Sequence, residues 1–166
     1  MNLLEKLGEQ GIIFYQLFFI YNYMNFKNKY SLMMFITILI NVFINLATKN
    51  QLMKLMKPYN HKLGFLGSFC RPLDKGCKNI SMTGYGMPSG HSQVASFIPA
   101  IYYFLYKDYD DFSYPKFLTM ISIGIFIMST RYTSKVHSIQ QIIVGSLYGI
   151  LIAYGMGKVI NYFDLS

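Results

Sequence analysis

Five stretches without a charged side chain constrain the fold of this chain more than any other feature of its sequence. They cover residues 10–26, 30–48, 92–106, 117–130 and 138–157. A helix needs about 20 apolar residues to cross the hydrocarbon core of a bilayer. The second and fifth stretches meet this length by themselves, and the first is slightly short. We therefore predict an all-α, polytopic membrane bundle of about five transmembrane helices.

The composition agrees with this prediction. Hydrophobic residues make up 53% of the chain and charged residues 13%, against about 45–50% and about 25% in soluble domains. A soluble fold would have to bury five apolar helices with little polar surface to cover them. We expect one integral, multi-pass membrane domain over residues 1–166, surrounded by membrane lipids, with the endoplasmic reticulum as a candidate location.

Two of the stretches, 92–106 and 117–130, hold only 15 and 14 residues. They border His91 and Arg131, and polar side chains are tolerated at membrane depth where protein buries them or where they line a cavity. We expect these two helices to extend through a polar site near one membrane face. If five helices alternate in direction, the loop 49–87 and the turn 131–136 lie on that same face.

Most of the net charge of +8 belongs to this face. Its cations outnumber a single acidic residue, Asp74, and are Lys49, Lys54, Lys57, Lys62, Arg71, Lys75, Lys78, Arg131 and Lys135. A basic concavity at membrane level suits an anionic lipid head group. The alternative is that the lysines only orient the protein, as the positive-inside rule describes.

The segment Pro88-Ser89-Gly90-His91 has the properties of a phosphate site. Ser89 stands where a helix N-cap belongs, and Gly90 lets its backbone N–H approach a ligand closely. A helix that starts near His91 directs free N–H groups and its positive dipole end toward an anion. We predict that Ser89 and Gly90 bind phosphate and that His91 is the general acid for the leaving oxygen.

Arg131, His137 and Gln141 complete this set. His137 lies six positions after Arg131, so on one continuous helix they would face different directions, and we predict a helix break between them. His137 and Gln141 share a face at i, i+4 spacing. Gln141 can accept the N–H of one imidazole nitrogen and leave the other free to attack phosphorus. Arg71 and Arg131 can clamp the phosphate through their guanidinium groups.

Each of these residues also has an inert interpretation. A single histidine is usually a surface or hydrogen-bonded core residue, and an arginine at a helix end usually extends its charge to the interface. Gln141 can simply bond to a neighbouring helix. The combination is more specific than its members, because the four-residue motif Pro-Ser-Gly-His alone occurs by chance in roughly one chain of this length per thousand.

Between about residues 50 and 149, the chain resembles the type 2 phosphatidic acid phosphatase superfamily, the lipid phosphate phosphatases. The family has three motifs: Lys, six residues, Arg-Pro; then Pro-Ser-Gly-His; then Ser-Arg, five residues, His, three residues, Asp. The second is intact at Pro88–His91. The third appears as Thr130-Arg131 and His137, with Gln141 in place of the aspartate. The longer match at 86–93 is most similar to the dolichyl diphosphatase branch.

The first motif matches least well. Arg71-Pro72 is present, but Gly64 stands seven residues before the arginine, where the family has lysine. The segment Asn50–Lys54 resembles the usual lead-in to that lysine, which makes Lys54 the candidate and implies an insertion of ten residues before Arg71. Two further lysines compete with Lys54 for this role: Lys57 and Lys62.

The resemblance implies a fold with the helical core shared by glucose-6-phosphatase and vanadium haloperoxidases. It implies that His137 is a nucleophile forming a phosphohistidine, with His91 as the acid. The implied phosphate binders are Arg71, Ser89, Gly90, Arg131 and Lys54. The implied function is metal-independent hydrolysis of a lipid phosphate monoester or diphosphate, such as a polyisoprenyl or dolichyl diphosphate or phosphatidate. No cofactor, metal or nucleic acid is expected.

Two alternatives stay open at this stage. One is a catalytically impaired scaffold or lipid-head-group binder on the same fold, which Gln141 and the displaced lysine favour. The other is a phosphatase of a soluble phosphate ester, which the same residues support. The sequence also leaves open the oligomeric state, the side of the membrane that the site faces and a disulfide between Cys70 and Cys77.

Overall fold

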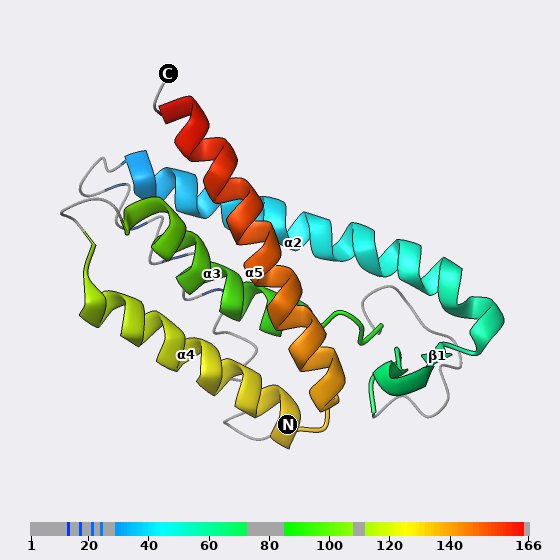
Figure 1. Ribbon diagram of the computed structural model, residues 1–166. Coiled ribbons are helices and arrows are strands. Elements are labelled where there is room, and N and C mark those ends of the chain that lie inside the picture. Colours follow the sequence, from blue (N-terminus) through cyan, green and yellow to red (C-terminus); the bar gives the residue numbers. More distant parts are fainter. Residues whose placement is uncertain are drawn as a thin grey trace.

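The computed structural model describes residues 29–72, 85–107 and 112–164, together with the single helical residues Ile13, Leu17, Tyr21 and Met24. This part of the chain contains four long helices: α2 (Lys29–Met56), α3 (Gly90–Tyr106), α4 (Tyr114–Thr133) and α5 (Ile139–Asp164). The expected all-α architecture is confirmed. Apart from those four single residues, the first expected span, 10–26, lies outside the described part. In Figure 1, α3 (green) lies among α2, α4 and α5.

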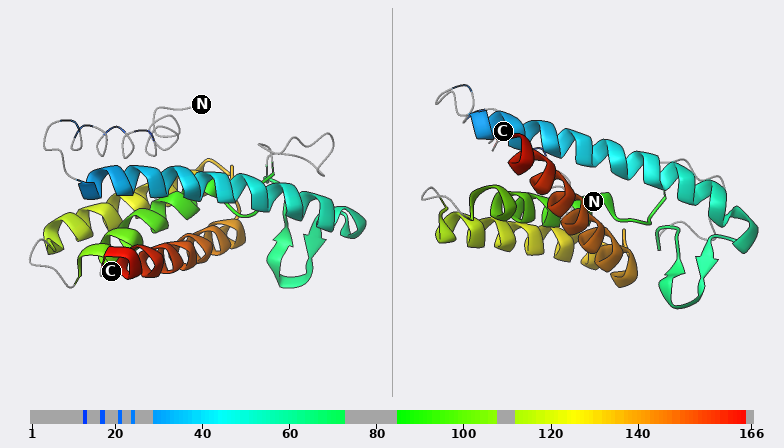
Figure 2. Two further views of the ribbon diagram at one scale, coloured as in Figure 1. Left: turned by 90° about the horizontal axis from the view of Figure 1, so that it is seen from above. Right: turned by 45° about the horizontal axis from the view of Figure 1, so that its top comes forward.

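A small hairpin follows α2. After the 3₁₀ turn Lys57–Tyr59, β1 (Lys62–Leu63) pairs antiparallel with β2 (Gly67–Ser68), and a second 3₁₀ turn, Gly64–Leu66, joins the strands. The hairpin lies within the insertion expected between Lys54 and Arg71. Figure 2 shows it projecting from the end of α2, away from the helices. The positive φ of +66° at Gly67, where β2 begins, is a conformation that glycine adopts without strain.

The helices are longer than the uncharged stretches that predicted them. The second expected span ended at residue 48, whereas α2 continues to Met56, and the fifth ended at 157, whereas α5 continues to Asp164. Leu, Met, Lys and Gln are all good helix formers, so a charged residue ends an apolar stretch without ending the helix. At the start of α4, Pro115 occupies the first turn, where its missing N–H has no cost.

Two of the described helices are long and apolar enough to cross a membrane. The candidate spans are Leu32–Tyr59 and Ile139–Phe163. The helices α3, with 17 residues, and α4, with 20 residues, are not among these spans. Of the five spans expected from the sequence, the second and the fifth are therefore long and apolar enough to cross a membrane in the described part of the chain. The others fall on shorter helices or outside it.

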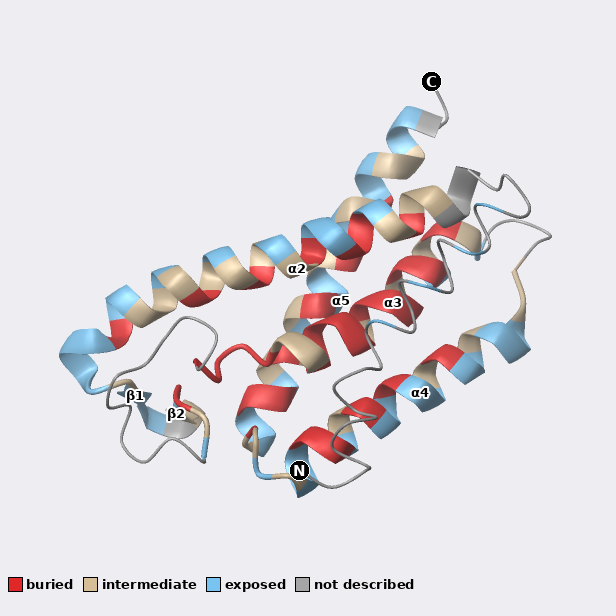
Figure 3. Cartoon of the chain, turned by 180° about the vertical axis from the view of Figure 1, so that it is seen from behind, coloured by how far each residue is buried: buried red, intermediate tan, exposed pale blue. Residues whose placement is uncertain are grey.

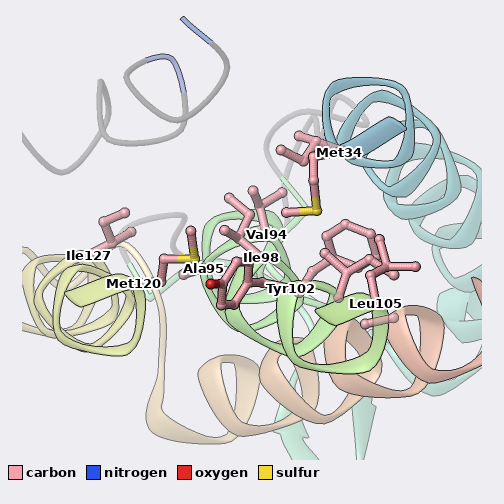
Figure 4. Packing of buried hydrophobic residues seen from close by; sticks show 12 residues of the cluster. Met34, Val94, Ala95, Ile98, Tyr102, Leu105, Met120 and Ile127 are labelled. Carbon is pink, nitrogen blue, oxygen red and sulfur yellow. The ribbon is translucent and has the colours of Figure 1, made fainter. Parts of the chain in front are cut away.

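Helix α3 forms the centre of the bundle. Most of its residues are buried, as Figure 3 shows by the red along its length. Phe97, Ile98 and Ile101 on α3 are fully buried and pack with Met34 of α2 and Ile127 of α4. Figure 4 shows the labelled members of this cluster gathered around α3. Helix α3 is therefore packed against its neighbouring helices, and the motif Pro-Ser-Gly-His lies at its N-terminal end.

Helix α5 approaches α3 through a row of small residues at every fourth position: Gly145, Gly149, Ala153 and Gly157. A Cβ atom at Gly145 would lie 2.5 Å from the Ser89 carbonyl oxygen, and one at Gly149 would overlap the Gln93 carbonyl oxygen. Small residues in such a row let two helix backbones pack at short distance, as they do in membranes. The absence of side chains at these two glycines therefore brings the N-terminal half of α5 against the motif segment.

Beside its apolar core, the bundle holds buried polar contacts between helices, and its outward faces are apolar. Asn41 and Asn45 of α2 are buried and bond to Gln93 of α3, whose Nε2 donates to Asn41 Oδ1 over 2.7 Å. The outward faces carry exposed apolar side chains, such as Phe43 at 72% and Leu151 at 66% exposure. Large exposed apolar surfaces mark contact with a membrane or a partner, and polar contacts between helices are typical of membrane bundles.

The close packing of α5 on α3 predicts that Gly149→Ala destabilises the fold. The added methyl group would overlap Gln93 O and Ser96 Oγ, so we expect a loss of about 1–3 kcal/mol in the free energy of unfolding. The matched control is Gly155→Ala on the same helix, because a Cβ there meets no atom within 4 Å. Thermal unfolding in detergent measures both variants, and equal midpoints would contradict the packing argument.

Candidate active site

The N-terminus of α3 is capped as the sequence predicts. Ser89 is the N-cap, and its Oγ accepts hydrogen bonds from Ser92 N over 3.3 Å and from Ser92 Oγ over 2.9 Å. The backbone N–H of Ser89 donates to Gln141 O over 3.2 Å, which ties the motif to α5. His91 therefore lies in the first turn of a helix whose N-terminal end is next to α5.

The predicted break between Arg131 and His137 is present. Helix α4 ends at Thr133, Lys135 adopts a positive φ of 55°, and α5 begins at Ile139. The backbone N–H of His137 donates to Arg131 O over 3.2 Å, so the turn folds back on the last residues of α4. Both side chains are 2% exposed. The break thus buries the two residues next to each other.

Five positively charged or imidazole side chains from separate segments converge. Electrostatic interactions link His91 to Arg131, His137, Arg71 and Lys49. Lys49 comes from α2, Arg71 from the segment after the hairpin and His91 from α3. Arg131 comes from the last turn of α4, and His137 from the turn between α4 and α5. The sequence predicted four of these residues as parts of one site, and the fold brings those four together.

Lys49 is the member that sequence reasoning missed as a site residue. It is 5% exposed, whereas Lys54 lies on an exposed face of α2 and is not among the charged neighbours of either histidine. Five residues along a helix rotate a side chain by about 140°, so the two lysines cannot face the same site. The competing lysines of the insertion, Lys57 and Lys62, are exposed as well. The geometry therefore groups Lys49, and not Lys54, with the site.

A signal for Lys49 was present in the sequence. Asn41, Asn45 and Lys49 recur at every fourth position of an otherwise apolar helix, and all three are buried on one face of α2. Polar residues on an apolar helix usually face the interior of a membrane bundle. The family spacing of the lead-in Asn50–Lys54 favours Lys54, whereas this periodicity favours Lys49.

The site is basic and offers donors to an anion. Among the described residues, the charged groups that act on His91 and His137 include no carboxylate. Arg71 Nε is buried and has no hydrogen-bond partner in that part of the chain. The described residues also hold no group of three His, Cys, Asp or Glu that suits a metal ion. Guanidinium and ammonium groups in this arrangement suit a phosphate.

His137 contacts Gln141 as predicted, with 3.0 Å between Nδ1 and Oε1. The pKa of His137 is lowered to about 3, chiefly by burial. The hydrogen bond with Gln141 acts in the opposite direction, and the positive charges of Arg71, Lys49 and Arg131 lower the pKa as well. The imidazole is therefore neutral near pH 7, which is the state in which a histidine acts as a nucleophile.

Backbone contacts fix Arg71 beside the motif segment. Phe69 O accepts hydrogen bonds from Gly86 N over 2.9 Å and from Met87 N over 3.1 Å, and the backbones of Cys70 and Tyr85 pair in an isolated antiparallel β-bridge. Burial raises the pKa of the Tyr85 phenol to about 12, so it stays protonated. Cys70 is disulfide-bonded. The chain has one other cysteine, Cys77, which lies outside the described residues.

Comparison with known proteins identifies the relatives of this chain. The sequence profile described as the PAP2 superfamily matches residues 26–164. A curated relative is the palmitoyl-protein thioesterase-dolichyl pyrophosphate phosphatase fusion 1 of Schizosaccharomyces pombe (strain 972 / ATCC 24843), 33% identical over 82 residues. That alignment covers 45% of this chain and 12% of the relative, so the chain spans a small part of that protein's length. No solved structure matches the chain.

These findings agree with the resemblance drawn from the motifs, including its dolichyl diphosphatase branch. They support a phosphoric ester hydrolase. Together with the two helices long and apolar enough to cross a membrane, they also indicate membrane association.

The low pKa of His137 predicts how stability depends on pH. Below a pH of about 6.5 the unfolded chain binds a proton at this histidine, whereas the folded chain binds it only near pH 3. The contribution of His137 to stability is thus complete above the unfolded pKa and is lost as the pH falls. At pH 5 the loss is about 2 kcal/mol.

His137→Asn removes this titration and keeps an N–H facing Gln141. Chemical unfolding in detergent at pH 7.5 and 5.0 should show a smaller decrease in unfolding free energy for the variant than for wild type. Equal decreases in the two proteins would contradict the low pKa.

Proposed function

Because this chain belongs to the PAP2 superfamily, we propose that it is a lipid phosphatase that hydrolyses a phosphate monoester or diphosphate through a phosphohistidine, without a metal ion. The observation that carries the proposal is the convergence of Lys49, Arg71 and Arg131 on the half-buried imidazole of His91 and the buried imidazole of His137, at a helix N-terminus. Cations and backbone N–H groups are the means by which proteins stabilise charge on a transferring phosphoryl group.

Each residue has a role in the proposed reaction. The three cations and the N–H groups at the start of α3 hold the phosphoryl oxygens. The ring nitrogen of His137 that does not face Gln141 attacks phosphorus and forms the N–P bond, while the bond to the leaving oxygen breaks. Burial and the neighbouring cations lower the pKa of His91 to about 3. The negative charge of the bound phosphate raises it again, so His91 binds a proton with the substrate and gives that proton to the leaving oxygen. Water, deprotonated by His91, then attacks the phosphohistidine, releases inorganic phosphate and restores His137.

The proposed substrate is a phosphorylated lipid, either a polyisoprenyl or dolichyl diphosphate or phosphatidate. The name of the Schizosaccharomyces pombe relative includes a dolichyl pyrophosphate phosphatase, which favours the first of these. The exposed apolar faces of α2, α4 and α5 favour a substrate that reaches the site from the bilayer. We also propose a single multi-pass domain in the endoplasmic reticulum membrane, with phosphorylated lipid and membrane lipids as its partners.

Phosphate release from a lipid tests this function. The purified protein in detergent with EDTA should release phosphate from dolichyl diphosphate or phosphatidate. His137→Asn should release none above background, because it has no nucleophilic nitrogen. Gln140→Glu is a control, because Gln140 is an exposed neighbour on the same helix. The measurement is inorganic phosphate against time at saturating substrate.

The other outcomes separate the competing functions. Release from glucose 6-phosphate but from neither lipid would indicate a phosphatase of soluble esters. Binding of the lipids without any release would indicate the catalytically impaired head-group binder. Activity that persists in His137→Asn would overturn the phosphohistidine step.

The grouping of Lys49 with the site predicts a difference between two lysines of α2. Lys49→Met removes a buried cation from the phosphate and should lower kcat/KM by about 100-fold, the usual effect of losing one donor to a transition state. Lys54→Met is the matched control on an exposed face of the same helix and should change kcat/KM less than twofold. A larger effect at Lys54 than at Lys49 would return the role to the lysine suggested by the family spacing.

A further inference from the structure

Gln141 is fully buried, and both the nitrogen and the oxygen of its side-chain amide form hydrogen bonds. Its Nε2 donates to two carbonyl oxygens at the end of the hairpin, Ser68 O over 2.9 Å and Cys70 O over 2.7 Å. Its Oε1 accepts from Ser138 N over 3.3 Å and faces His137 Nδ1 at 3.0 Å. The amide thus connects the hairpin with the proposed nucleophile.

These contacts fix which way the amide points. A carbonyl oxygen can only accept a hydrogen bond, so the NH₂ group of Gln141 must face Ser68 and Cys70. The amide oxygen must then face His137, and because that oxygen also only accepts, the proton of the imidazole must be on Nδ1. His137 Nε2 keeps its lone pair. The backbone of the hairpin therefore selects, through Gln141, the tautomer that can attack phosphorus.

Gly86 leaves the space that the amide occupies. A Cβ atom at this position would lie 2.6 Å from Gln141 Oε1 and 2.7 Å from Gln141 Nε2. Gly86 also donates its backbone N–H to Phe69 O, beside the two carbonyls. The amide is thus enclosed between the end of the hairpin and the segment that leads to the Pro-Ser-Gly-His motif.

The hairpin itself is tied to α2. His61 N donates to Met56 O over 3.0 Å, at the last residue of α2, and Phe69 N donates to His61 O over 2.8 Å. Through these bonds, the segment that carries the Ser68 and Cys70 carbonyls is attached to α2, the helix that carries Lys49.

We propose that the hairpin and Gln141 form one positioning unit for His137, and that the hairpin carbonyls require glutamine where the family's third motif has aspartate. This inference rests on the proposed function. An aspartate is one methylene shorter and offers no donor to the two carbonyls. A glutamate has the length of glutamine but turns a charged oxygen toward them, which leaves the buried carbonyl of Cys70 without its donor.

The kinetic test compares Gln141→Asp and Gln141→Glu with Gln140→Glu. Both changes at Gln141 should lower kcat by about 10- to 100-fold, as is usual for groups that orient a reactive residue, with KM changed less than threefold. The exposed Gln140→Glu should leave both constants unchanged. Gln141→Asp restores the family motif, so wild-type or higher activity in that variant would overturn the proposal.

The spectroscopic test needs no turnover. In protein labelled with ¹⁵N-histidine, two-bond ¹H–¹⁵N spectra distinguish the tautomers, and His137→Asn identifies the signals of His137. Wild type should carry its proton on Nδ1, and a proton on Nε2 would overturn the proposal. Gly86→Ala should displace the amide, mix the tautomers and lower kcat, whereas Gly155→Ala should change neither; an unchanged Gly86→Ala would also count against it.

The two tests separate this inference from the proposed function. If wild type releases no phosphate from any substrate but His137 is protonated on Nδ1, the proposed function fails and the positioning unit stands. If phosphate is released with His137 protonated on Nε2, the phosphatase activity stands and the positioning unit fails. Variants that fail to fold are replaced by the wild-type tautomer measurement, which requires no substitution in the unit.

Discussion

The close approach of α5 to α3 is the contact on which the rest of the site depends. Gly145 and Gly149 face backbone oxygens of Ser89 and Gln93, so any larger side chain would push the helices apart. With the helices in contact, Ser89 N bonds to Gln141 O, and the turn that carries His137 lies beside the first turn of α3. The catalytic chemistry proposed for this chain therefore depends on side chains that are absent as much as on those that are present.

Around this contact, the protein gathers positive charge in a place where water is scarce. Burying a cation has a cost that is offset only by a suitable partner. Lys49 and Arg131 are 5% and 2% exposed, and they converge with Arg71 on two imidazoles. A bound phosphate would provide the negative charge that such an arrangement favours. Burial also keeps His137 neutral, so in the proposed reaction the environment that attracts the phosphate also leaves the imidazole able to act as the nucleophile.

Predictions that depended on short spacings agree with the structure, and those that depended on longer ones do not all agree. The Ser89 cap, the break after Arg131 and the contact of His137 with Gln141 each involve residues within six positions of one another, and all are present. The motif lysine depended on an alignment across an insertion. That alignment led to Lys54, which is exposed. Helix α2 continues past its apolar stretch, and its rotation of about 100° per residue turns Lys49 toward the bundle and Lys54 away from it.

The sequence by itself determined the all-α membrane bundle, the helix start at the motif Pro-Ser-Gly-His and the pairing of His137 with Gln141, because apolar length and helical periodicity are local properties of the chain. Only the tertiary structure decided that Lys49 joins the site and that Ser68 and Cys70 set the direction of the Gln141 amide. Those contacts join residues more than 70 positions apart for the amide and 42 apart for Lys49 and His91. Their geometry follows from how the helices and the hairpin pack, which no local spacing encodes.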